Sequence, residues 1–193
     1  RFAQISTFGV DTIRRFHENV SEMKKLAARD FEDILQCSVP AFEGLLPGAH
    51  DKRLLKLLYK MAEWHALAKL RMHTEETLAR LEVLTRELGI AMRDYRDNTC
   101  AMFETFETPA EAAARTRRKA AQEKKAAVAS GTAADAPRQT TKKSGANQSK
   151  QAKTLNLATY KWHALGDYVS TIRLFGPTDN YSTQVVSMHC TSS

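Results

Sequence analysis

The hydrophobic residues follow a helical period over most of the first half of this 193-residue chain. Between residues 21 and 37, apolar side chains recur at steps of three and four, which predicts an amphipathic helix with Ser21 as its N-cap. Asp11 is a similar cap for a short helix over residues 12–19. Pro40 suits the first turn of another short helix, which Pro47-Gly48 would end.

Two longer helices are predicted next. Residues 51–73 form the most apolar stretch of the chain, with only a narrow strip of lysines, so we expect a central helix that is packed on several sides. Thr74 then opens a second helix, with Glu75 and Glu76 in its first turn and an apolar side that continues to about Glu107. The short joints favour antiparallel neighbours, and hence a helical bundle over residues 1–107.

The character of the sequence changes at Thr108. Thr108 to Glu111 is a capping box with Pro109 at the first helical position, and the residues that follow to about 130 are strong helix formers. Val128 is the only sizeable apolar residue of this segment, so we expect a solvated basic helix over residues 108–130. Residues 131–154 have no aromatic side chain and a low-complexity composition, which predicts a disordered linker.

An apolar pattern returns in residues 155–193. It predicts a C-terminal helix with Thr159 as its cap, ended by Gly176-Pro177, and then an irregular tail. The prediction for the whole chain is therefore an all-α protein: an irregular helical bundle with an extended basic helix, a disordered linker and a C-terminal helix.

The positive charge is concentrated in one part of the chain. The formal net charge is +7, whereas residues 108–153 alone contain 11 Lys or Arg and 3 Asp or Glu. A polyanionic partner would meet this segment first. Cations of this kind neutralise phosphates with strong salt dependence and little sequence preference, and the lack of aromatic residues among them argues against base stacking. The predicted nucleic-acid-binding residues are Arg115, Arg117, Arg118, Lys119, Lys124 and Lys125. A nuclear localisation signal and a charged, solubilising linker are the alternatives for the same run.

The tetrapeptide Trp-His-Ala-Leu occurs twice, at residues 64–67 and 162–165. His65, His73 and His163, with Glu63, could suggest a metal site, but His65 and His73 lie about 12 Å apart along one predicted helix and cannot share an ion. The flanking sequences do not match, so an internal repeat is also disfavoured. Both copies are best explained as buried helical positions, with Trp162 and Leu165 docking the last helix against the bundle.

Other catalytic and cofactor motifs do not emerge. There is no phosphate-binding glycine loop and no G-x-S-x-G, and the acidic group of Asp30, Glu32 and Asp33 has the pattern of a solvated helix face, so we expect neither a cofactor nor a metal. Cys37, Cys100 and Cys190 are odd in number and widely spaced, which argues against a disulfide framework and for a reducing compartment. We expect no membrane span, no secretion signal, and a nuclear or cytoplasmic location.

Three stretches, taken together, resemble a known family. They are FGVDTIRRFHENVSEMKKLAARDFEDILQCSVPAFEGLLP, WHALAKLRMHT and HALGDYVSTIRLFGPTDNYSTQ. They are similar to the region downstream of the catalytic core in Plavaka-type transposases of mushroom-forming fungi, relatives of the Kyakuja–Dileera–Zisupton group. The resemblance covers residues 8–184 apart from the low-complexity stretch 108–153, and the last nine residues depart from the family.

The resemblance implies DNA transposition by an RNase H-like core that uses acidic residues and two divalent metal ions. In that family the leading acidic motifs lie upstream of the matched region, so no catalytic residue is carried over; Glu63 is the one acidic residue beside a family motif on a buried helix. The start at Arg1 and the tail that departs from the family together suggest a piece of a longer or decayed protein. The expected function is therefore a non-catalytic helical part of a transposase-derived protein, which packs on a missing catalytic core or contacts DNA through the basic helix. The alternatives are a stand-alone helical protein-interaction module and a metal-dependent nuclease.

Overall fold

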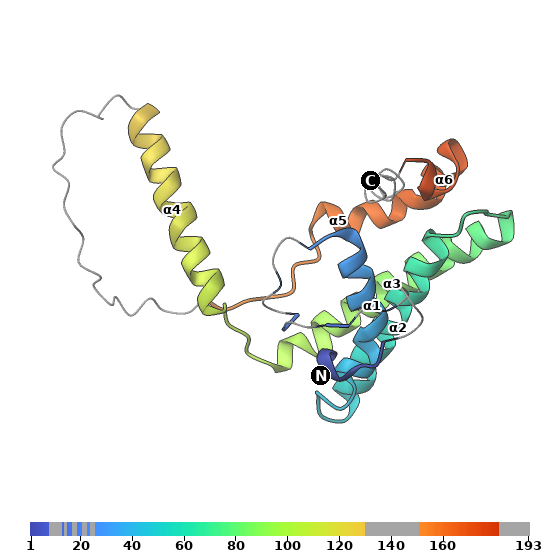
Figure 1. The fold of residues 1–193 in the computed structure, drawn as a ribbon, viewed down its shortest axis with the longest axis horizontal. Helices are drawn as coiled ribbons and strands as arrows, with labels where there is room; N and C mark the ends of the chain where they lie inside the picture. The colour runs from blue at the N-terminus through green and yellow to red at the C-terminus, as the bar shows by residue number, and fades with distance from the viewer. Residues whose placement is uncertain are drawn as a thin grey trace. The chain divides into compact units, whose positions relative to one another are not determined.

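The computed structural model describes residues 1–7, 13, 15–16, 19–20, 23, 26–129 and 151–181. Over these residues the protein is all-α, with an isolated antiparallel bridge between Phe106 and Ala152 and no β-strand (Figure 1). Most of the predicted helix over residues 12–19, most of the predicted linker and the tail after Tyr181 lie outside them. The chain divides into two compact units, one made of residues 1–102 and 156–193 and the other of residues 103–155. The C-terminal segment therefore belongs to the same unit as the bundle.

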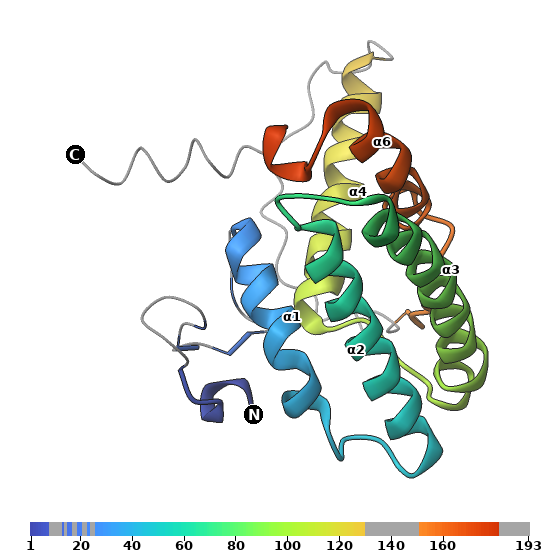
Figure 2. The ribbon, with the colours of Figure 1, turned by 90° about the vertical axis from the view of Figure 1, so that its right-hand side faces the viewer.

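Three helices form the body of the first unit. They are α1 (Ala28–Phe42), α2 (Ala49–Ala68) and α3 (Glu75–Asn98), and they lie side by side in alternating directions (Figure 2). Short 3-10 turns at Phe2–Gln4 and Cys100–Met102 flank this body. The predicted antiparallel bundle is thereby confirmed for the described residues.

The helix boundaries differ from the predicted ones in four places. Helix α1 begins at Ala28 rather than after Ser21, because the carboxylate of Asp30 accepts a hydrogen bond from the Ala27 amide and caps that position. It also continues through Pro40 instead of restarting there. Helix α2 ends at Ala68, five residues before the predicted end, and α3 ends at Asn98, well before Glu107.

The core lies where α3 meets its neighbours. Leu81 and Leu84 are fully buried, and the buried positions of α3 recur at the predicted steps of three and four: Leu78, Leu81, Leu84, Leu88 and Met92. Burying a leucine side chain contributes roughly 1.5–3 kcal/mol, so this row stabilises the bundle strongly. Thr74 caps α3 as predicted, since its hydroxyl accepts a hydrogen bond from the Thr77 amide.

The C-terminal segment packs against α3 and the α2–α3 turn. It forms α5 (Tyr160–His163), a 3-10 turn (Ala164–Asp167), α6 (Tyr168–Phe175) and a last 3-10 turn (Thr178–Asn180). Tyr168 packs edge-on against Trp64, with ring centroids 4.7 Å apart, and the Thr178 hydroxyl donates to the Ala68 carbonyl. Gly176, with a positive φ of 83°, ends α6 at the predicted position. The segment thus lies on the bundle, but through Tyr168 and Thr178, whereas the predicted docking residues Trp162 and Leu165 are half-buried and line a pocket.

Candidate nucleic-acid interface

The basic segment folds into α4 (Pro109–Ala129) in the second unit. The predicted capping box starts it: the Thr108 hydroxyl accepts from the Glu111 amide at 3.3 Å, and the Glu111 carboxylate accepts from the Thr108 amide at 2.8 Å. That backbone hydrogen bond is also the main cause of a lowered pKa of Glu111. With 21 residues, α4 is about 30 Å long.

An ion pair between the half-buried Arg115 and the buried Glu107 stabilises the beginning of α4. Arg115 donates two hydrogen bonds to the carboxylate of Glu107. Glu107 is only 5% exposed. The hydrogen bond from Arg115 is the main cause of a lowered pKa of Glu107, and the same bond raises the pKa of Arg115. Bidentate arginine–carboxylate pairs are geometrically specific as well as strong, so this pair fixes the orientation of the first turns of α4.

Residues 151–153 also hold the beginning of α4. Phe106 and Ala152 form an antiparallel bridge, the Glu107 amide donates to the Gln151 carbonyl at 2.9 Å, and the Lys153 amide donates to the Thr105 carbonyl at 2.8 Å. The Lys153 ammonium lies 3.4 Å from the Glu111 carboxylate. These residues were predicted to belong to the linker, whereas the structure pairs them with the residues that precede α4.

The six predicted cations differ in their surroundings. Arg115 is half-buried and forms an ion pair with Glu107. The other five are exposed and have no ion pair within the described part of the chain: Arg117, Arg118, Lys119, Lys124 and Lys125. At about 100° per residue, Arg118 and Lys125 share one face of α4, while Arg117 and Lys124 share a face about 100° away. The exposed cations therefore cover more than half of the circumference of the helix.

An open groove of about 470 Å³ follows one face of α4. Arg115, Arg118 and Lys119 line it from the helix, and Gln151 and Lys153 line it from the returning chain. Glu107 and Glu111 also line it, but each already lies against a cation. Within the residues that the structure describes, the groove therefore offers Arg118 and Lys119 as positive charges without an ion pair, an arrangement that suits phosphate oxygens rather than an apolar ligand.

Several of the residues considered for metal binding lie against other side chains. Glu63 accepts a hydrogen bond from Arg80 at 2.6 Å, and the nearest carboxylate to His65 belongs to Glu32, at 3.8 Å. Burial lowers the pKa of both His65 and His73, which favours their neutral forms. In the described ranges, no group of three or more His, Cys, Asp or Glu side chains is placed to hold a metal ion.

The two copies of Trp-His-Ala-Leu occupy different environments. Trp64 is buried, and its indole N–H donates to the Thr85 hydroxyl at 2.8 Å. Trp162 is only half-buried and lines a pocket, and His163 is exposed. The first copy is a core element as predicted, whereas the second is not fully buried.

Comparisons with known protein families, with curated proteins and with solved structures found no match. Among the described helices, none is both long and apolar enough to cross a membrane.

Proposed function

We propose that this chain is a non-catalytic helical protein that contacts the phosphate backbone of DNA through α4. The observation that carries the proposal is the set of five exposed cations on one helix, all without an ion pair in the described structure: Arg117, Arg118, Lys119, Lys124 and Lys125. Unpaired surface cations release counterions from a polyanion on binding, whereas paired ones must first break their own contacts.

The length of the basic segment suits a nucleic acid duplex. From Arg117 to Lys125 the helix rises about 12 Å, and a duplex of that length carries about seven phosphates. Five cations therefore meet enough phosphates to be engaged at the same time. The major groove is wide enough to admit an α-helix, and cations on two faces about 100° apart would reach the two backbones that border it.

The resemblance to Plavaka-type transposases selects DNA as the polyanion and a transposase-derived protein as the context. In this proposal the helical body packs on a catalytic core supplied elsewhere, and α4 adds affinity without reading the sequence. Phosphate contacts position a protein on DNA but carry no direct sequence information. The chain itself performs no cleavage.

The alternative is a stand-alone helical protein-interaction module. Three strongly exposed apolar side chains near the α2–α3 turn and the end of α6 favour it: Met72, Leu174 and Phe175. Arg71 pairs with Asp179 and Arg173 with Glu75, so neighbours of these apolar residues are joined across the same end of the unit. This alternative predicts DNA binding that is weak and indifferent to the charge of α4.

Fluorescence anisotropy with a labelled duplex of random sequence tests the proposal on the full chain. The five exposed cations of α4 are replaced together by glutamine. The matched control replaces five exposed cations of the first unit, so that both variants lose the same charge: Arg15, Lys52, Lys56, Arg86 and Lys161. We expect the α4 variant to lose at least about tenfold in affinity at 50 mM salt and the control to lose much less. Equal losses of affinity in both variants would show that net charge alone explains the binding, and this result would contradict the proposal.

A further inference from the structure

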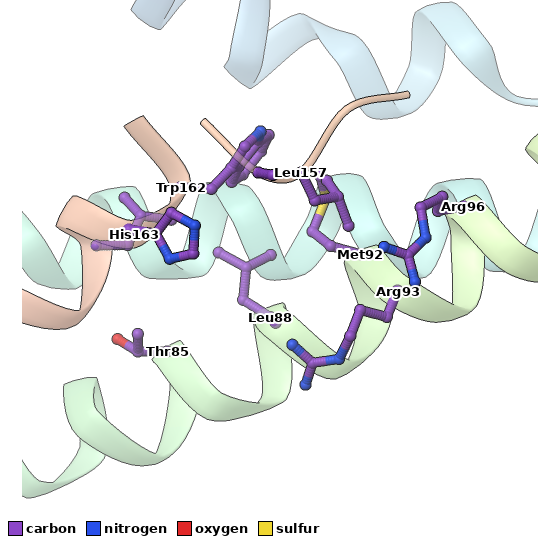
Figure 3. A pocket seen from close by; sticks show the side chains of 11 residues that line it. Thr85, Leu88, Met92, Arg93, Arg96, Leu157, Trp162 and His163 are labelled. Carbon is purple, nitrogen blue, oxygen red and sulfur yellow. The ribbon is translucent and has the colours of Figure 1, made fainter. Parts of the chain in front are cut away.

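An open pocket of about 340 Å³ lies in the first unit, between α3 and the C-terminal segment. Its volume falls at the lower end of the roughly 300–1,000 Å³ that is usual for small-molecule sites. Helix α3 contributes the buried side chains of Leu88 and Met92, and the C-terminal segment contributes Leu157, Trp162 and Leu165. The apolar part of the pocket thus has walls from two segments that are distant in the sequence (Figure 3).

Two arginines give the pocket a charged edge. Figure 3 shows Arg93 and Arg96 on the α3 side, beside Leu88 and Met92, with Leu157, Trp162 and His163 opposite them. Arg96 donates two hydrogen bonds to Asp97, at 2.6 and 3.1 Å. Arg93 has no carboxylate within ion-pair distance in the described part of the chain, although it contributes to lowering the pKa of Asp97. As far as the described residues go, the Arg93 guanidinium is therefore available to bind an anion.

Glycine at position 89 places the free guanidinium. A Cβ at Gly89 would lie 3.4 Å from Nη1 of Arg93, so the arginine lies directly over the glycine and against the pocket. A longer side chain at this position would occupy the space that the guanidinium now fills. Thr85, the other polar residue of α3 in the pocket, is already engaged, because it accepts from Trp64 and donates to the Leu81 carbonyl. Arg93 is thus the polar group of α3 most available to a ligand.

We infer that this pocket binds a small carboxylic acid with an apolar body, whose carboxylate pairs with Arg93 and whose body lies against Leu88, Met92 and Trp162. The charge complementarity selects the class: an uncharged apolar molecule would leave Arg93 unused, and a small anion would leave the apolar walls exposed. A carboxylate and a guanidinium form strong, charge-assisted hydrogen bonds, which are stronger beside apolar walls than in open water. Nothing in this inference depends on the DNA-binding proposal, because the pocket and α4 belong to different units.

Isothermal titration calorimetry on the full chain tests the inference with three probes below their aggregation concentrations: decanoate, decanol and acetate. Decanol shares the apolar body without the charge, and acetate shares the charge without the body. We expect decanoate to bind at least about tenfold more tightly than decanol, and acetate to show no measurable binding. Equal affinity for decanoate and decanol would overturn the inference, as would no binding of decanoate.

Three variants, with folding checked by circular dichroism, assign the binding to this pocket. Arg93→Gln should remove the preference for decanoate over decanol, whereas Lys161→Gln, an exposed charge-matched control beside the pocket, should retain it. Leu157→Glu should abolish binding of both long probes, because it places a carboxylate at the apolar wall. Undiminished decanoate binding by Arg93→Gln would overturn the inference. A chain that ignores decanoate but dimerises, with dimerisation lost in Leu157→Glu, would assign the pocket to a second copy and also overturn it.

Discussion

Arg115 donates two hydrogen bonds to the buried carboxylate of Glu107, eight residues earlier in the chain. The same carboxylate accepts a hydrogen bond from the Gln151 amide at 3.3 Å. Glu107 therefore links the start of α4 to the segment that returns from it. This relationship removes one of the six predicted cations from the surface available to phosphates and gives α4 a fixed base.

Replacing Glu107 with glutamine should loosen this base and release Arg115. We expect faster hydrogen exchange at the backbone amides of Glu107 and Lys153, because the bridge between their segments loses its central contact. The salt dependence of duplex binding should become steeper by about 0.9, the contribution of one more cation. Glu104→Gln is the matched control, since Glu104 is exposed and the charge change is the same. Unchanged exchange rates in Glu107→Gln would show that the ion pair does not hold the bridge.

The ion pair also predicts how the base of α4 responds to pH. Because the folded pKa of Glu107 is lowered, its contribution is present above the ordinary glutamate pKa of about 4.3 and is lost as the pH falls through the lowered value. A carbon NMR titration should place the midpoint of the Glu107 carboxyl below about 4.3, and Arg115→Gln should raise it. A midpoint at or above that of an ordinary glutamate would contradict the geometry.

The core row of α3 makes a direct prediction for stability. Leu84 is fully buried, so Leu84→Ala should lower the free energy of unfolding by about 2–5 kcal/mol in urea denaturation. Val83, the preceding residue, is 39% exposed, and Val83→Ala should change the same free energy by no more than about 0.5 kcal/mol. Similar losses in the two variants would mean that α3 does not present this face to the core.

The hydrogen bond between Trp64 and Thr85 couples the buried copy of Trp-His-Ala-Leu to α3. Thr85→Val keeps the shape of the side chain but removes the acceptor of the buried indole N–H, so it should cost about 1–3 kcal/mol. Thr85→Ser keeps the hydroxyl acceptor, so it should keep most of the stabilisation that this hydrogen bond provides. If urea denaturation shows that Thr85→Val costs little, or clearly less than Thr85→Ser, then packing of the γ-methyl group, rather than the hydrogen bond, is what stabilises this contact.

Local sequence signals predicted the parts of this fold that depend on neighbours along the chain. The cap at Thr74, the capping box at Thr108–Glu111, the buried row of α3 and the stop at Gly176 all follow from residues within one or two turns of each other. The helix ends at Ala68 and Asn98 did not follow, because apolar residues such as Leu70 and Met72 continue the helical period into a turn. A period shows which side chains share a face, not where the backbone stops being helical.

The candidate sites could likewise be predicted only in part from the sequence. The positive charge of α4 is visible in the sequence, but the pairing of Glu107 with Arg115 and Gln151 joins residues up to 44 positions apart and has no helical spacing that would reveal it. The pocket beside α3 likewise depends on residues 157–165 returning to Leu88 and Met92. Contacts of this kind are set by how the chain packs, so a pattern read along the sequence does not contain them.

The salt dependence of duplex binding tests the central claim most directly. Five phosphate contacts predict a slope of about −4 to −5 for the logarithm of the binding constant against the logarithm of salt concentration, falling to near zero when the five exposed cations of α4 become glutamine. The charge-matched variant of the first unit should keep the slope of the unaltered chain. A slope that survives neutralisation of α4 would contradict the account, because the phosphates would then be contacting another surface.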